Sequence, residues 1–105
     1  MSRIILPPQL VGTVQSQSFD FTSLLASGET ISTQSVVASV WTGTDASASA
    51  IVSGSASASG AVVTQAISLV GKTAGTIYEL LCTITTSASQ TLKISAFLAA
   101  VPDLP

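Results

Sequence analysis

From residue 18 onward, apolar and polar residues alternate in short runs that are separated by turn residues. A period of two is typical of β-strands, because successive side chains point to opposite faces of a sheet. The clearest runs are residues 76–86 and 91–101, and the connector between them has the length of a hairpin loop. We therefore predict a hairpin whose two strands each bury one face. The residues expected on the buried faces are Tyr78, Leu80, Cys82, Ile84, Leu92, Ile94, Ala96, Leu98 and Ala100.

The earlier part of the chain predicts further strands of the same kind, notably over residues 31–41 and 61–70. Their inward residues, together with those of the run before them, are expected to be Phe19, Phe21, Val36, Ala38, Val40, Val63, Ile67 and Leu69. Residues 45–60 consist almost entirely of alanine and serine, which bury little area and define a strand register poorly. We expect a short strand over residues 50–53 between flexible loops. The alternative is a surface of small side chains that another backbone can approach closely.

Evidence for helices is poor, because apolar residues do not recur at spacings of three and four. Six or seven short strands with turns near every ten residues predict an all-β fold, a small antiparallel immunoglobulin-like β-sandwich. The disulfide of antibody domains is missing, because Cys82 is the only cysteine. The run from Gly75 to Tyr78 predicts a tyrosine corner, in which the Tyr78 hydroxyl bonds to the backbone at the start of a strand.

The first 17 residues have a different character, so we divide the chain into an extended N-terminal arm, residues 1–17, and a sandwich domain, residues 18–105. Two adjacent prolines fix the backbone and remove two hydrogen-bond donors, which argues against the interior of a sheet. The arm is either an edge strand or disordered terminus, or an apolar segment that docks on a neighbouring subunit. In the second case its contact residues would be Arg3, Ile4, Ile5, Leu6, Pro7 and Pro8.

Charged residues make up only 8% of the chain, against about 25% in ordinary soluble domains. The three cations are scattered, which excludes the clustered positive charge that nucleic-acid binding needs. The uncharged stretch over residues 46–71 is too rich in serine to be a membrane span. The apolar residues before Pro7 are too few for a secretion signal, so we expect synthesis in a cytoplasm.

Catalytic chemistry finds no support in the sequence. Without histidine there is no Ser-His-Asp or Cys-His arrangement, and neither Lys72 nor Lys93 follows a serine at the spacing of a Ser–Lys pair. The five carboxylates show neither paired nor calcium-loop spacing, and Cys82 falls on a buried strand face. We therefore predict a protein that is not an enzyme and that uses no cofactor and no metal.

Two aromatic residues are candidates for a protein interface. Trp41 ends a predicted strand and either fills the core or faces a partner, and Phe97 lies on the outward phase of the last strand, which we take to be an edge. A surface built of serine, threonine and alanine suits a subunit that is packed against others, because buried charges are costly. The composition thus favours an assembly subunit.

Two segments resemble a family of small virion proteins of tailed bacteriophages, the fiber-tail adaptors. The first is FDFTSLLASGETI over residues 19–31, and the second runs from Gly75 through Tyr78 to Ser87. The closing turn, residues 87–90, departs from the family because it lacks the usual glycine, and the arm matches nothing in it.

This resemblance implies an immunoglobulin-like, non-enzymatic adaptor, present in several copies in a ring around the tail or neck. Its partners would be tail or neck subunits and a fibre or tailspike. Gly28 and Ile31, with Glu29 between them, would mark a structural turn, and Gly75 and Tyr78 would form the corner. Contacts would be made by the arm and by exposed strand edges.

Two other functions remain open from the sequence. One is a capsid decoration (cement) protein on the phage head, which would coat heads at high copy number. The other is an immunoglobulin-like module of a bacterial adhesin, which would be a stable monomer that tolerates removal of the arm.

Overall fold

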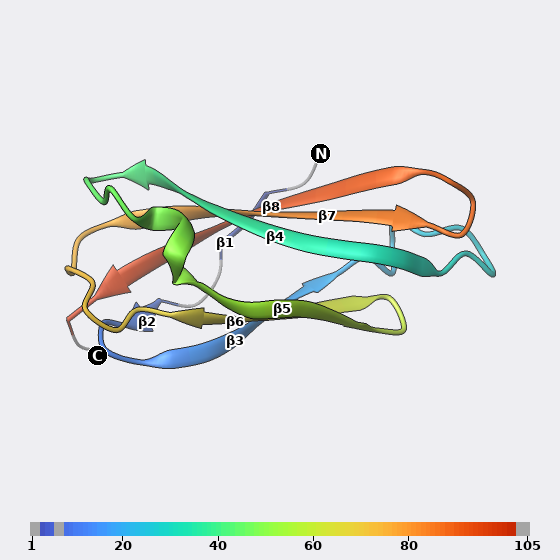
Figure 1. Cartoon of the computed structure of the whole chain (residues 1–105). Coiled ribbons are helices and arrows are strands. Elements are labelled where there is room, and N and C mark those ends of the chain that lie inside the picture. The colour runs from blue at the N-terminus through green and yellow to red at the C-terminus, as the bar shows by residue number, and fades with distance from the viewer. Residues whose placement is uncertain (1–2, 6–7, 103–105) are drawn as a thin grey trace.

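Two β-sheets pack face to face in this protein (Figure 1). The computed structural model describes the backbone of residues 3–5 and the whole of residues 8–102. In chain order the strands are β1 (Arg3–Ile5), β2 (Gln9–Leu10), β3 (Val14–Asp20), β4 (Ile31–Thr42), β5 (Val52–Ser59), β6 (Val62–Ser68), β7 (Ile77–Thr86) and β8 (Thr91–Val101). One turn of 3-10 helix, η1 (Ala48–Ile51), precedes β5.

The strand order confirms the predicted all-β, immunoglobulin-like sandwich. One sheet has the order β1–β8–β7–β4, with β2 also paired to β8, and the other has the order β3–β6–β5. In chain order, β3 to β8 take the places of strands B to G, which divide between sheets in the same way in immunoglobulin domains. Pairing is antiparallel except that β1 and β2 run parallel to β8. Because β1 and β2 follow one another along the same strand, the sandwich has seven strand positions.

The core lies between the sheets and consists of the alternate residues of each strand. Strand β7 is the clearest case, since every second residue from Tyr78 to Ile84 is fully buried. Its central residue, Leu80, pairs with Ala38 on one side and Ala96 on the other, so one large side chain fills the space above two small neighbours. The inward residues expected from the alternation are all buried, except that Val40 and Leu92 are half-buried.

The alanine- and serine-rich segment folds differently from our expectation. Instead of a short strand over residues 50–53, the chain forms η1 and then the eight-residue strand β5 at the edge of its sheet. Pairing with β6 supplies the backbone hydrogen bonds that small side chains cannot specify by themselves. The pairing is interrupted between Ser53 and Ser57, where Gly54 has a φ of 73°.

The turn between β7 and β8, residues 87–90, contains no glycine, yet one of its residues has a left-handed backbone. Ser89 has a φ of 62°, and within the described part of the chain it is the non-glycine residue with a positive φ. This left-handed conformation favours glycine, because a Cβ crowds the backbone there. The serine thus takes up a turn conformation that glycine adopts more easily.

The boundary expected at residue 17 falls inside a strand. Strand β3 begins at Val14, and its pairing with β6 runs from Val14 to Asp20. Before it, the described parts of the arm pair with β8, so they belong to the first sheet. The chain then crosses to the second sheet through a turn at Gly12, whose N–H donates to the Leu69 carbonyl at 2.8 Å.

Candidate interaction surfaces

The outer face of the β4–β7–β8 sheet carries both aromatic candidates. Trp41 is not part of the core: its side chain is 53% exposed and packs against Phe97 with the rings tilted by 43° and their centroids 4.9 Å apart. The alternation of β4 turns Val36 and Ala38 inward and therefore turns Val37 outward, where it is 58% exposed. Aromatic and apolar side chains from separate strands thus meet on one outer surface.

The sheet edges differ from the sequence interpretation. We expected Phe97 on an edge strand, but β8 lies between β7 and the N-terminal strands β1 and β2. The edges of the first sheet are instead β4 on one side and the short strands β1 and β2 on the other, and the edges of the second sheet are β3 and β5. The physical reason is that the N-terminal segment occupies the backbone hydrogen-bonding edge of β8, which alternation along β8 alone cannot reveal.

Hydrogen bonds of two buried glutamines hold the described part of the arm on the sandwich. Gln9 of β2 is fully buried, and its Nε2 donates to the Ile67 carbonyl of β6 at 2.9 Å and to the Thr13 carbonyl at 3.2 Å. Gln17 Nε2 donates to Gln9 Oε1 at 3.3 Å. One side chain therefore links the two sheets. Gln9 was not singled out from the sequence, because isolated glutamines are usually exposed.

The contact residues predicted for the arm lie in and after strand β1. Arg3, Ile4 and Ile5 form β1 and pair with residues 95–97 of β8. Pro8 is exposed. Leu6 and Pro7 lie outside the described residues.

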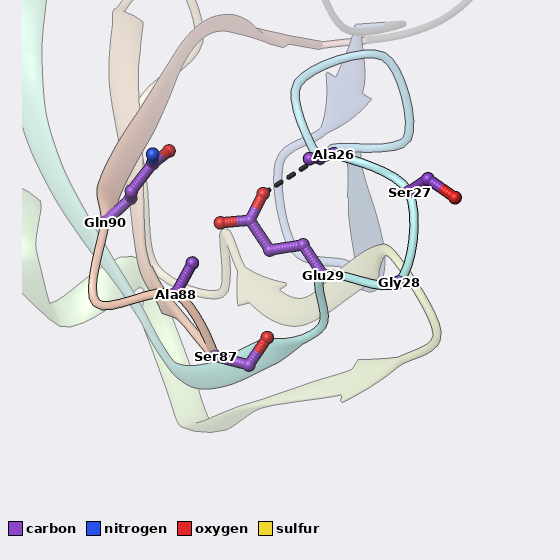
Figure 2. A pocket seen from close by; sticks show the side chains of 7 residues that line it. All are labelled: Ala26, Ser27, Gly28, Glu29, Ser87, Ala88 and Gln90. Carbon is purple, nitrogen blue, oxygen red and sulfur yellow. Dashed lines mark hydrogen bonds between the residues drawn. The ribbon is translucent and has the colours of Figure 1, made fainter.

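The carboxylate of Glu29 connects two loops at one end of the sandwich, the loop before β4 and the turn between β7 and β8 (Figure 2). Its carboxylate accepts from the Ala26 N–H at 2.8 Å, across a turn in which Gly28 has a φ of 82°. It also accepts from the Thr86 hydroxyl at the end of β7. The loop and the β7–β8 turn line a hollow of about 260 Å³ between them. Ile31 follows as the half-buried first residue of β4, packed against the core.

These hydrogen bonds hold the pKa of Glu29 below its usual value, first through Thr86 and then through the Ala26 N–H. The pKa of Asp20 is lowered in the same direction by the Thr22 hydroxyl and N–H. A carboxylate with a lowered pKa stabilises the fold above its unfolded pKa of about 4, and this contribution is lost as the pH falls through the folded pKa.

We therefore expect the melting temperature to fall as the pH is lowered from about 5 to about 3, the range below the unfolded pKa of carboxylates. Glu29→Gln should have a lower melting temperature than the native chain at neutral pH, with a smaller decrease on acidification. Calorimetric scans over this pH range measure both effects. An identical pH profile for the variant and the native chain would show that Glu29 does not stabilise the loops.

At the opposite end, Tyr78 forms a corner that differs from the one predicted. Tyr78 is fully buried near the start of β7, as expected, but its hydroxyl donates to Asp45 Oδ2 at 2.7 Å instead of to the backbone. Lys72 Nζ lies 3.1 Å from the same oxygen, and Asp45 Oδ1 accepts from the Ser47 N–H at 2.8 Å. The preceding turn requires Gly75, which has a φ of 97° and donates to the Ala100 carbonyl.

The electrostatics of this cluster follow from those contacts. The Tyr78 hydroxyl, then the Ser47 N–H and Lys72, hold the pKa of Asp45 below its usual value. Burial, reinforced by the Asp45 carboxylate, raises the pKa of Tyr78. The tyrosine therefore remains a neutral hydrogen-bond donor, and the cluster connects two loops to the start of β7.

Tyr78→Phe should lower the free energy of unfolding by about 1–2 kcal/mol, because it removes a hydrogen bond to a charged acceptor while keeping the buried ring. Urea unfolding followed by tryptophan fluorescence measures the change. Asp45 keeps its bonds to Ser47 and Lys72 in this variant, so complete unfolding is not expected. An unchanged unfolding midpoint would refute the stabilising role of the corner.

The described residues offer little for chemistry. Cys82 is fully buried, and burial raises the pKa of its thiol to about 12, which disfavours the thiolate that nucleophilic attack needs at neutral pH. Within residues 3–5 and 8–102, no three potential ligands gather in a way that could hold a metal ion. The same part of the chain contains no helix with the length and apolar character required to cross a membrane.

Residues 11–99 match the model of the Gp77 family, which is described as podophage GP4 fiber-tail adaptor protein gp77. The chain belongs to this family. The matched region runs from the turn before β3 almost to the end of β8 and includes the loops held by Glu29 and by Tyr78. No curated protein matches the sequence significantly.

Membership in the Gp77 family confirms the resemblance to tailed-phage fiber-tail adaptors and identifies a structural component of the phage tail. The match leaves out residues 1–10, which include β1 and β2. The family therefore accounts for the sandwich, whereas the role of the arm in this Gp77-family chain has to be argued from its contacts.

Proposed function

We propose that this chain is a non-enzymatic subunit that links the tail body or neck of a phage to its fibres or tailspikes by protein–protein contacts. The family match over residues 11–99 carries the proposal. The sparse charge and the exposed aromatic and aliphatic side chains of the β4–β7–β8 sheet support it, because such surfaces are typical of interfaces.

The contacts follow from the sheet edges and from the arm. Strand β4 is a long outer strand, so a partner strand can add to it by β-augmentation, with Trp41 and Phe97 on the adjacent face. Residues 3–8 of the arm contact a neighbouring subunit in the assembled ring, in addition to the pairing of β1 with β8. The chain acts without nucleic acid, membrane or cofactor, and it is made in the cytoplasm of the host bacterium before it joins the virion.

Immunogold electron microscopy of purified phage particles, with an antibody raised against this chain, tests the position. Label at the tail or neck supports the adaptor function. Label spread over the head would instead indicate a capsid decoration protein, and particles without label would contradict a role in the virion. An antibody against the major capsid protein serves as the control for labelling of the head.

A further inference from the structure

The outer edges of the two sheets differ in how they are protected against pairing with a further strand. Proteins protect such edges with very short strands, charged side chains, prolines or bulges. The first sheet ends on one side in the short strands β1 and β2, the pairing of β5 is interrupted between Ser53 and Ser57, and β3 ends in the charged Asp20. Strand β4 has none of these features over residues 33–40, the run between its two irregularities, and is therefore the open edge.

A hydrogen bond beside β7 shows which backbone groups of β4 face this edge. The Ala100 N–H donates to the Thr76 carbonyl at 2.9 Å, in the register in which β7 pairs with β8. Even-numbered residues of β7 therefore bond to β8, and odd-numbered ones bond to β4, because successive residues of an antiparallel strand bond to opposite sides. The odd-numbered residues of β7 pair with odd-numbered residues of β4. The N–H and C=O groups of Gln34, Val36 and Ala38 consequently point to the open edge.

A hollow of about 320 Å³ lies beside this edge, between β4 and β5. The two strands are neighbours on the same side of the sandwich (Figure 1). Residues 34–36 of β4 line the hollow from one sheet, and residues 54–56 of β5 line it from the other. A strand added to β4 would aim every second side chain between the sheets and thus at the hollow. Because a cavity of about 150 Å³ can hold a benzene molecule, the hollow admits a large side chain.

The lining of the hollow favours an apolar side chain. None of the lining residues is charged. The two glutamine amides among them are already bonded: Gln34 Nε2 donates to the Ala56 carbonyl at 3.2 Å, and Gln65 Nε2 donates to the Ser53 carbonyl at 2.9 Å. A charged side chain in the hollow would lose its hydration without gaining a counter-charge, whereas an aliphatic one would contact Val36.

A second copy of the sandwich fits this edge poorly. If its own β4 were the added strand, the side chains that point between the sheets would include Val36 and Ala38, and these already fill the core of that copy. An added strand can place a side chain in the hollow only if that side chain is not packed in a sandwich of its own. The occupant is therefore an extended tail or loop, and not the edge strand of a folded sandwich.

We infer that β4 binds an extended segment of another virion protein, which pairs with the backbone of Gln34, Val36 and Ala38 and places one large apolar side chain between β4 and β5. In this mode of binding the main-chain hydrogen bonds provide affinity and the pocket for a side chain provides specificity. The inference rests on the proposed adaptor function and names the chemistry of the segment that one of its edges receives.

The first test uses tail particles assembled in the absence of this chain, to which the purified native chain or a variant is added back. Quantitative mass spectrometry of washed particles measures the incorporated chain, and thermal unfolding checks that each variant folds. Ser55→Trp places a large side chain in the hollow and should lower incorporation about tenfold or more. Ser59→Trp is the matched control, because Ser59 is an exposed serine of the same strand outside the hollow, and it should incorporate as the native chain does.

Hydrogen exchange measures the pairing itself. In the free chain the N–H groups of Val36 and Ala38 should exchange quickly, because they point to the open edge, whereas the N–H of Val37 is bonded to β7 and should exchange slowly. When the chain is bound to the tail particles, residues 33–40 should become protected. Residues 14–20 of β3, an edge of the other sheet, should keep the exchange of the free chain.

Four results would overturn the inference. Native-level incorporation of folded Ser55→Trp, or no added protection over residues 33–40, would show that β4 does not receive the partner, while the adaptor function stands. Protection of β3 in place of β4 would assign the contact to another edge. A native dimer that Ser55→Trp converts to monomer in analytical ultracentrifugation would show that a second copy occupies the edge. If the native chain itself does not bind the tails, the adaptor function fails and the inference fails with it.

Discussion

Replacing Leu80 with alanine should lower the free energy of unfolding by about 3–5 kcal/mol, the upper part of the range for leucine-to-alanine changes in cores. Leu80 is fully buried at the centre of β7, between Ala38 of β4 and Ala96 of β8. Its neighbours are too small to close the cavity, so the variant loses both the transfer free energy of the side chain and the contacts around the void. Urea unfolding measures the loss.

The next residue supplies the control. Leu81 is a leucine on the same strand, but it points to the outer face and is half-buried. Leu81→Ala should cost only about 1 kcal/mol or less, because water and neighbouring side chains fill the space on the surface. Equal losses for the two variants would contradict the assignment of the two faces of β7.

Gln9→Ala should lower the free energy of unfolding by about 2 kcal/mol and release the N-terminal strands from β8. The change removes the bond to the Ile67 carbonyl and leaves the Gln17 amide without its acceptor in a buried position. Hydrogen exchange should become faster at the Val11 N–H, which bonds to the Val101 carbonyl, because that bond depends on the position of β2. At the centre of β7, hydrogen exchange should become faster only by the amount that the lower free energy of global unfolding requires.

Gln15→Ala is the matched control for this prediction. Gln15 is a glutamine of strand β3 with an exposed side chain, so its removal should change neither the stability nor the exchange of the N-terminal segment by a measurable amount. If Gln9→Ala behaves like this control, the glutamine contacts do not hold the arm.

The strands of the central hairpin were predictable because their information is local. The alternation from Tyr78 to Ile84 and from Leu92 to Ala100 requires one face to be buried whatever the rest of the chain does, and the structure buries that face. The turns at Gly28 and Gly75 were also predictable, because glycine is the residue that best tolerates a positive φ. In the structure both glycines have one.

Long-range contacts were not predictable in the same way. Tyr78 was expected at a corner, but its hydroxyl partner, Asp45, lies 33 residues earlier in the chain, and no local pattern connects the two. The alternation of Val36, Ala38 and Val40 places Trp41 on the outer face, where the structure has it, but the large ring also favoured burial in the core, and only the structure decided between the two.

The sequence by itself determined the all-β class, the hairpin and the identity of most core residues, because a period of two and the turn residues act on neighbouring positions. Only the tertiary structure decided that β1 and β2 pair with the edge of β8, that Gln9 is buried between the sheets and that the Tyr78 hydroxyl bonds to Asp45. These features depend on which strands become neighbours in space. That arrangement is set by the packing of the whole sandwich, and no single segment of the chain encodes it.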